Sequence, residues 1–154
     1  MPEQPSWRDE APQPVQDDID ALAEAAFDAA ERLLGLSREF SPFAVALDGT
    51  GLQTVVATDP GPAREPSPQA LLEELVASVR GERGRYRAVG FVALVFIRTG
   101  DAVRVELEHR DGGPALVLLR PCRVGRLRHR VRGHRVTMGG VAGSFGSNRV
   151  WERA

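Results

Sequence analysis

The chain has 154 residues, of which 42% are hydrophobic, 20 are basic and 21 are acidic. This length suits one domain and is short for two, and the near-balanced charge gives no general reason to expect a polyanionic partner. Every basic residue is an arginine, which excludes a Schiff-base lysine and the lysine of a phosphate-binding P-loop.

The compartment can be predicted from the cysteine count and the apolar runs. A single cysteine, Cys122, cannot form a disulfide within the chain, so a secreted disulfide scaffold is not expected. The N-terminal residues are polar and do not resemble a signal peptide. The longest strongly apolar run, Phe91 to Ile97, is far shorter than the roughly 20 residues of a membrane-spanning helix. We therefore expect a cytoplasmic protein without a membrane partner.

Residues 1–16 contain four prolines and few apolar side chains, which predicts a disordered tail, and residues 17–154 are expected to form a single domain. A helix is predicted to start at Asp17 or Asp18, because acidic residues stabilise the first turn of a helix. Its apolar residues recur at steps of three and four, and Gly35 is expected to end it.

A hairpin is expected next. Residues 43–47 and 53–57 have the composition of strands, and the sequence Asp-Gly-Thr-Gly at 48–51 is typical of a turn. A second helix is predicted to begin with Ser67 as its N-cap and Pro68 at its first position, and to close at Gly81.

The rest of the chain is expected to be mostly strands. Residues 88–97 are continuously apolar, which predicts a central strand covered on both faces. Residues 103–108 alternate between apolar and charged, residues 115–119 are apolar, and residues 126–136 alternate again. Residues 139–147 include four glycines and are predicted to be a loop or a poorly defined last strand. The expected fold class is α+β, with one mostly antiparallel sheet of five to six strands flanked by two helices.

Two resemblances arise from these patterns. The order of elements over residues 17–120 resembles that of the roadblock and profilin-like group of small α+β domains. The stretch Glu-Phe-Ser-Pro-Phe at 39–43 followed by Asp48-Gly49, and the stretch Val-Glu-Leu-Glu-His-Arg at 105–110, are similar to a pattern in small uncharacterised bacterial proteins. These resemblances imply the fold class and assign no functional residue.

The charge is unevenly distributed. Residues 120–154 contain nine arginines and one acid, whereas residues 1–119 have a net charge of −9. If residues 126–136 form a strand, four guanidinium groups lie along one face, which we call the basic ribbon: Arg126, Arg128, Arg130 and Arg132. Such a ribbon can bind phosphates. The alternative is that these arginines face water or pair with the acidic first helix.

A second candidate site lies on the predicted strand at 103–108. Arg104, Glu106 and Glu108 share one face of this strand, and His109 is the next residue. Two carboxylates and an imidazole can support general acid–base chemistry. Alternating charges are equally typical of a solvated strand whose acids pair with arginine.

No cofactor or metal is predicted. Cys122, His129 and His134 are spaced more widely than most zinc ligands. The glycine-rich segment at 139–146 is followed by no helical pattern, as a nucleotide-binding loop would require.

These observations favour a non-catalytic module that binds another protein or itself. A nucleic-acid-binding module that uses the basic ribbon is the alternative, and an enzyme of unrecognised type is the third hypothesis. The candidate binding residues are Arg104, Glu106, Glu108, His109, Arg126, Arg128, Arg130 and Arg132.

Overall fold

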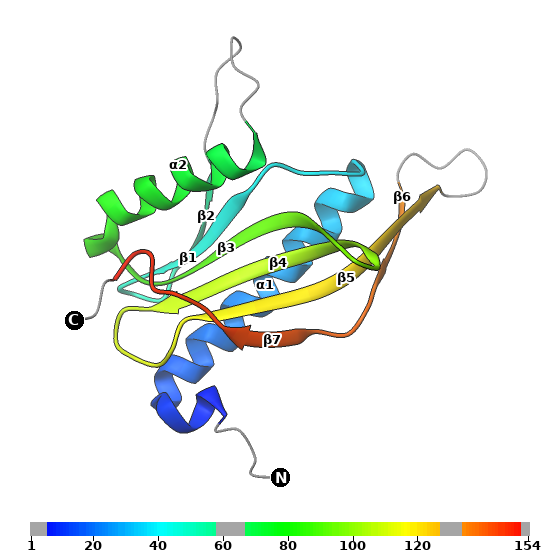
Figure 1. Ribbon diagram of the computed structural model, residues 1–154. Coiled ribbons are helices and arrows are strands. Elements are labelled where there is room, and N and C mark those ends of the chain that lie inside the picture. The colour runs from blue at the N-terminus through cyan, green and yellow to red at the C-terminus, as the bar shows by residue number, and fades with distance from the viewer. Residues whose placement is uncertain (1–5, 58–66, 127–133, 152–154) are drawn as a thin grey trace.

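The computed structural model describes residues 6–57, 67–126 and 134–151 (Figure 1). Two helices and seven strands form most of this part of the chain, with single turns of 3-10 helix at Trp7–Glu10 and Arg83–Arg85. In chain order they are α1 (Gln13–Leu36), β1 (Phe43–Asp48), β2 (Gln53–Ala57), α2 (Pro68–Gly81), β3 (Tyr86–Ile97), β4 (Gly100–His109), β5 (Leu116–Arg126), β6 (His134–Met138) and β7 (Ala142–Phe145).

The strands form one antiparallel sheet in the order β2-β1-β3-β4-β5-β6. β7 pairs with the first part of β5, and β6 pairs with the last part of the same strand. The α+β class, with a single antiparallel sheet and two helices, is therefore confirmed. The described residues hold one strand more than the expected five to six, because the glycine-rich segment forms β7.

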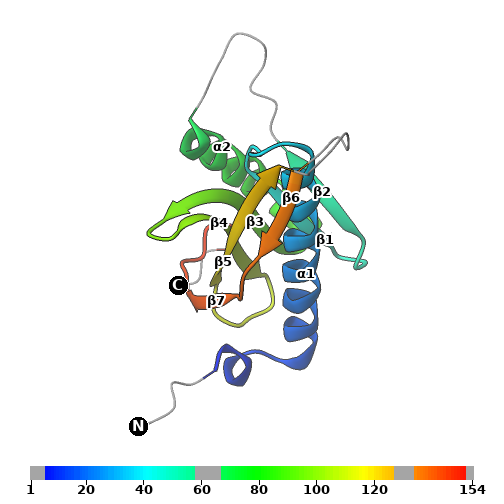
Figure 2. The same cartoon turned by 90° about the vertical axis from the view of Figure 1, so that its right-hand side faces the viewer.

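α1 covers one face of the sheet and α2 covers part of the other, as Figures 1 and 2 show. The larger core lies under α1, where Leu22, Ala26 and Leu34 pack against Val92 and Val105. Residues of α1 contact β1, β3, β4 and β6. α1 thus lies over the central strands β3 and β4, and it also reaches β1 on one side and β6 on the other.

The smaller core lies under α2. Leu75 and Val79 of α2 pack against Val89 and Phe91 of β3, and Val150 from the C-terminal segment completes the cluster. Ser67 caps α2 by accepting a hydrogen bond from the backbone N–H of Ala70 at 3.1 Å, as expected for a serine before Pro68. α2 packs against β1, β2 and β3, so the outer parts of β4 and β5 lie beyond it on this face.

The expectation of a tail over residues 1–16 is wrong for the residues from Ser6 onwards. α1 begins at Gln13, with Pro12 at its N-cap, because prolines are well accommodated where the helix lacks partners for its N–H groups. Ala11 and Val15 are buried beside the β4–β5 turn, where Gly113 has a φ of +74°. Residues 1–5 lie outside the described part of the chain.

The structure also corrects the end of α1 and the extent to which β3 is central. Gly35 does not end α1, which continues to Leu36 and closes with a hydrogen bond from the N–H of Ser37 to the carbonyl of Leu33. β3 is central only over its first half, because β1 pairs with it no further than Val92. Beyond that point β3 has β4 as its partner, and Phe96 near the hairpin tip is 84% exposed.

The predicted strand over residues 126–136 is described only at its two ends, because residues 127–133 lie outside the described part of the chain. Arg126 is the last residue of β5 and His134 is the first of β6, and these two strands pair with each other. Among the described residues, no helix is both long and apolar enough to cross a membrane.

Candidate functional site

Glu106 lies between two arginines on the sheet face that α1 does not cover. Its side chain comes from β4 and is 11% exposed. Arg149, from the C-terminal segment, donates from Nη2 to Oε1 at 3.3 Å, and its Nε forms an ion pair with Oε2 at 2.9 Å. Nη1 of Arg104 also donates to Oε1. Both carboxylate oxygens are therefore held by guanidinium groups.

Glu108 binds the backbone of the C-terminal segment. Its carboxylate accepts hydrogen bonds from the N–H groups of Arg149 at 3.0 Å, Val150 at 3.0 Å and Trp151 at 2.8 Å. Successive backbone N–H groups that converge in this way form an anion-binding concavity. Because the side chain is 4% exposed and Val150 belongs to the smaller core, Glu108 is an anchor for this segment.

His109 lies on the opposite face of β4, under α1. Its Nε2 is 2.8 Å from Oδ2 of Asp18, and its Nδ1 accepts a hydrogen bond from the N–H of Asp111 at 2.9 Å. These partners place the ring proton on Nε2, which then donates to Asp18. The structure therefore separates His109 from Glu106 and Glu108, because successive residues of a strand point to opposite faces.

Asp18 has a second partner in Arg87, whose Nη2 donates to Oδ1 at 2.8 Å. Burial alone disfavours the carboxylate, but the hydrogen bonds from His109 and Arg87 outweigh that effect and lower the pKa of Asp18. The three side chains join α1, β3 and β4 across the larger core.

Most of the predicted basic ribbon lies outside the described residues. Arg126 is placed as the last residue of β5, and Arg128, Arg130 and Arg132 fall within residues 127–133, which the structure does not describe. The hypothesis that these arginines bind nucleic acid stays a prediction.

The structure describes only part of the trio Cys122, His129 and His134. Cys122 is buried, and burial raises the pKa of its thiol. His129 lies outside the described residues. Within the described ranges, the His, Cys, Asp and Glu side chains form no group of three or more that could hold a metal ion.

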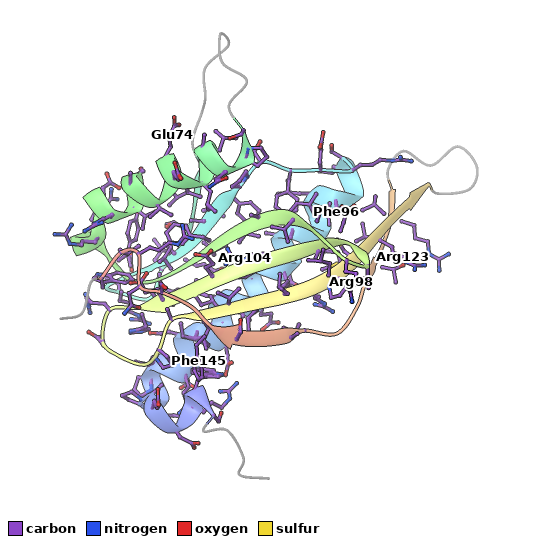
Figure 3. All side chains as sticks on the ribbon, in the orientation of Figure 1. Glu74, Phe96, Arg98, Arg104, Arg123 and Phe145 are labelled. Atoms are coloured by element: carbon purple, nitrogen blue, oxygen red, sulfur yellow. The ribbon has the colours of Figure 1, made fainter. Side chains whose placement is uncertain are left out.

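A pocket of about 430 Å³ opens beside Glu106. We call it the sheet-face pocket, and its floor is the face of β4 and β5 that α2 leaves open. The residues that matter here are Arg104, Glu106, Val117, Leu119, Phe145 and Arg149. Figure 3 labels Arg104 over the middle of the sheet and Phe145 beside β7, with β5 between them. The sequence predicted the charges on β4 but not Arg149, which is 43 residues from Glu106 and shares no local pattern with it.

A second cavity, of about 620 Å³, lies between the end of α1 and the β1–β2 hairpin. We call it the α1–β2 cleft. Leu36 and Val55 line it and are 79% and 66% exposed. A cavity of about 470 Å³ adjoins it further along α1 and shares Ala29, Arg32 and Val55 with it. The sequence did not predict this cleft, because it does not show how far across the sheet α1 extends.

Comparison with family models, curated proteins and solved structures finds no match for this chain. The resemblances to the roadblock and profilin-like group and to small bacterial proteins therefore stay predictions. The function has to be inferred from the geometry of the chain itself.

Proposed function

We propose that this domain is a non-catalytic module that binds another protein, and that it receives an apolar segment of that protein in the α1–β2 cleft. One observation supports this most directly. α1 packs over β1, β3, β4 and β6, so Val55 on the edge strand β2 and Leu36 at the end of α1 are left exposed on the two sides of an apolar cavity. Large exposed apolar surfaces on a domain typically mark interaction sites.

The charges around the cleft indicate the kind of segment that fits. Glu24 and Asp28 line the part along α1, Glu39 lines the part at the helix end, and Arg32 is the one basic residue that lines both. Among the described residues, the charged side chains around the apolar surface are therefore mainly acidic. We infer that the partner segment presents apolar side chains to Leu36 and Val55 and basic side chains to the rim.

The carboxylates on β4 support a non-catalytic role. A general base must reach the proton that it removes at hydrogen-bond distance. Oε1 of Glu106 accepts hydrogen bonds from Arg104 and Arg149, its Oε2 is paired with Nε of Arg149, and the carboxylate of Glu108 accepts three hydrogen bonds from the backbone. Both side chains are thus engaged in holding the sheet and the C-terminal segment together.

Selection from a displayed peptide library tests the proposal. Peptides that bind the wild-type chain should be apolar with flanking Arg or Lys, and Val55→Glu should weaken their binding at least tenfold, because a charge would then occupy the apolar wall. Leu52→Glu is the matched control, since Leu52 is 62% exposed in the β1–β2 turn and does not line the cleft. Selected peptides should bind this control variant as they bind the wild type.

Three results would overturn the proposal. One is the recovery of peptides whose binding Val55→Glu leaves unchanged. Another is the recovery of acidic peptides only. The third is a concentration-dependent dimer, seen by light scattering, that Val55→Glu abolishes, because a second copy of the chain would then occupy the cleft.

A further inference from the structure

The sheet-face pocket has a composition that interaction through the α1–β2 cleft does not explain. It lies on the opposite face of the sheet from α1, and it combines two arginines with apolar walls. Its volume of about 430 Å³ is within the range of small-molecule sites, which is about 300–1,000 Å³. The residues that line this pocket indicate what kind of molecule it fits.

The two arginines of the pocket share one of its two carboxylates. Arg104 and Arg149 share the single carboxylate of Glu106, so these three side chains have a net charge of +1. Glu108 also lines the pocket and brings the formal charge of the four side chains to zero, but its carboxylate is directed at three backbone N–H groups instead of at the guanidinium groups. An anion that enters the pocket would therefore meet an incompletely neutralised pair of guanidinium groups.

These guanidinium groups keep donors for a ligand. Each has five N–H donors. Arg104 uses Nη1 for Glu106, and Arg149 uses Nε and Nη2, and the structure gives these two side chains no further hydrogen bond within the described ranges. Their side chains are 31% and 38% exposed, so the remaining N–H groups are accessible beside the pocket.

The other walls are apolar. Val117 and Leu119 of β5 are half-buried, and Phe145 of β7 is 56% exposed. Ser144 and Ser147 add hydroxyl groups at the rim. A molecule with one anionic end and an apolar body would match both halves of this lining.

We propose that the sheet-face pocket binds a small organic carboxylate, with its carboxylate on Arg104 and Arg149 and its apolar body against Leu119 and Phe145. A carboxylate matches the planar guanidinium fork. A carboxylate brings one negative charge to a pocket whose four charged side chains sum to zero, so Glu106 and Glu108 repel it less than they repel a phosphate dianion. This site is independent of the α1–β2 cleft, so either proposal can fail without the other.

Titration of the full chain with octanoate tests the proposal, with octanol and inorganic phosphate as comparison probes. Binding is measured by calorimetry and by the NMR signals of the arginine Nε–H groups. Octanoate should bind at one saturable site and shift the signals of Arg104 and Arg149, while octanol and phosphate bind at least tenfold more weakly.

Substitutions then separate the pocket from the rest of the surface. Arg104→Leu should weaken octanoate binding at least tenfold. Arg123→Leu is its matched control, because Arg123 is exposed and lies outside the pocket, and it should leave binding unchanged. Glu106→Gln should tighten binding, because both guanidinium groups would lose their competing carboxylate.

The proposal is wrong if octanoate shifts the signal of Arg123 as much as those of Arg104 and Arg149. It is equally wrong if phosphate or octanol binds as tightly as octanoate, or if folded Glu106→Gln binds octanoate more weakly. The NMR comparison uses the wild-type chain, so it decides the question even if a variant does not fold.

Discussion

Replacing Glu108 with alanine tests whether one carboxylate anchors the C-terminal segment. The change leaves the backbone N–H groups of Arg149, Val150 and Trp151 without their acceptor. A buried donor without a partner costs about 1–3 kcal/mol. Val150 is 1% exposed, whereas the other two residues are half-buried and can bind water. Taking about 2 kcal/mol for Val150 and about 1 kcal/mol for the other two together, we expect the free energy of unfolding to fall by about 3 kcal/mol.

Urea unfolding measures this loss, and hydrogen exchange locates it. The amide of Val150 should lose its protection before those of β3 and β4, because its hydrogen bond to Glu108 is the one removed. If the segment detaches while the sheet stays folded, the urea m-value should also fall, since less surface would be exposed on unfolding.

Glu73→Ala is the matched control for this experiment. Glu73 is exposed on α2, so its loss should change the free energy of unfolding by no more than about 0.5 kcal/mol. The anchor interpretation would be refuted if Glu108→Ala were as mild as Glu73→Ala, or if the amide of Val150 kept its wild-type protection.

Three other predictions concern the two faces of the sheet and the N-terminal residues. Asp18→Asn should reduce the free energy of unfolding by about 2 kcal/mol at pH 7, because Asp18 loses charge-assisted hydrogen bonds. Because the pKa of Asp18 is lowered, its carboxylate stabilises the fold above the unfolded value of about 4, so the difference between Asp18→Asn and wild type should shrink as the pH falls below 4. Asp20→Asn is the control, because Asp20 is exposed and paired with Arg8, and it should reduce the free energy of unfolding by less than about 1 kcal/mol. Equal losses for the two variants in urea titrations would contradict the assignment. Val92→Asp should prevent folding because Val92 is fully buried. Val95→Asp should give a chain that is folded by circular dichroism, because Val95 is half-exposed. If neither variant folds, the outer half of β3 belongs to the core. Deleting residues 1–11 should lower the melting temperature by several degrees, and an unchanged value would mean that this segment contributes nothing to stability.

The parts of the fold that could be predicted depend on neighbours in the sequence. The β1–β2 turn is an example, because Oδ1 of Asp48 accepts hydrogen bonds from the N–H groups of Thr50 at 2.8 Å and Leu52 at 3.0 Å. Aspartate makes such bonds with residues two to four positions ahead, so the turn can be predicted from its composition. The capping of α2 by Ser67 is predictable for the same reason.

The features that were predicted wrongly from the sequence depend on contacts between residues that are far apart in it. Phe96 is exposed because β1 begins at Phe43, opposite Val92, and so leaves the outer half of β3 without a partner on that side. Ala11 and Val15 are buried because they pack beside the β4–β5 turn, about 100 residues away in the sequence. The pairing of Glu106 with Arg149 is equally remote in the sequence. The charges on β4 were predicted as a candidate site, but no local pattern indicates which arginine they meet.

The pairing of β6 and β7 along one strand affects how the molecule can associate with copies of itself. β6 pairs with Cys122–Arg126 and β7 with Leu116–Leu119, and the chain crosses between them at Gly139, whose N–H donates to the carbonyl of Pro121 at 2.8 Å. This side of the sheet therefore ends in strands of five and four residues instead of one long strand. Stacking into cross-β fibrils typically requires continuous segments of about six or seven residues with few glycines. The interrupted, glycine-containing edge is thus poorly suited to templating fibril growth, and natural sheets commonly use short edge strands in this way to resist aggregation.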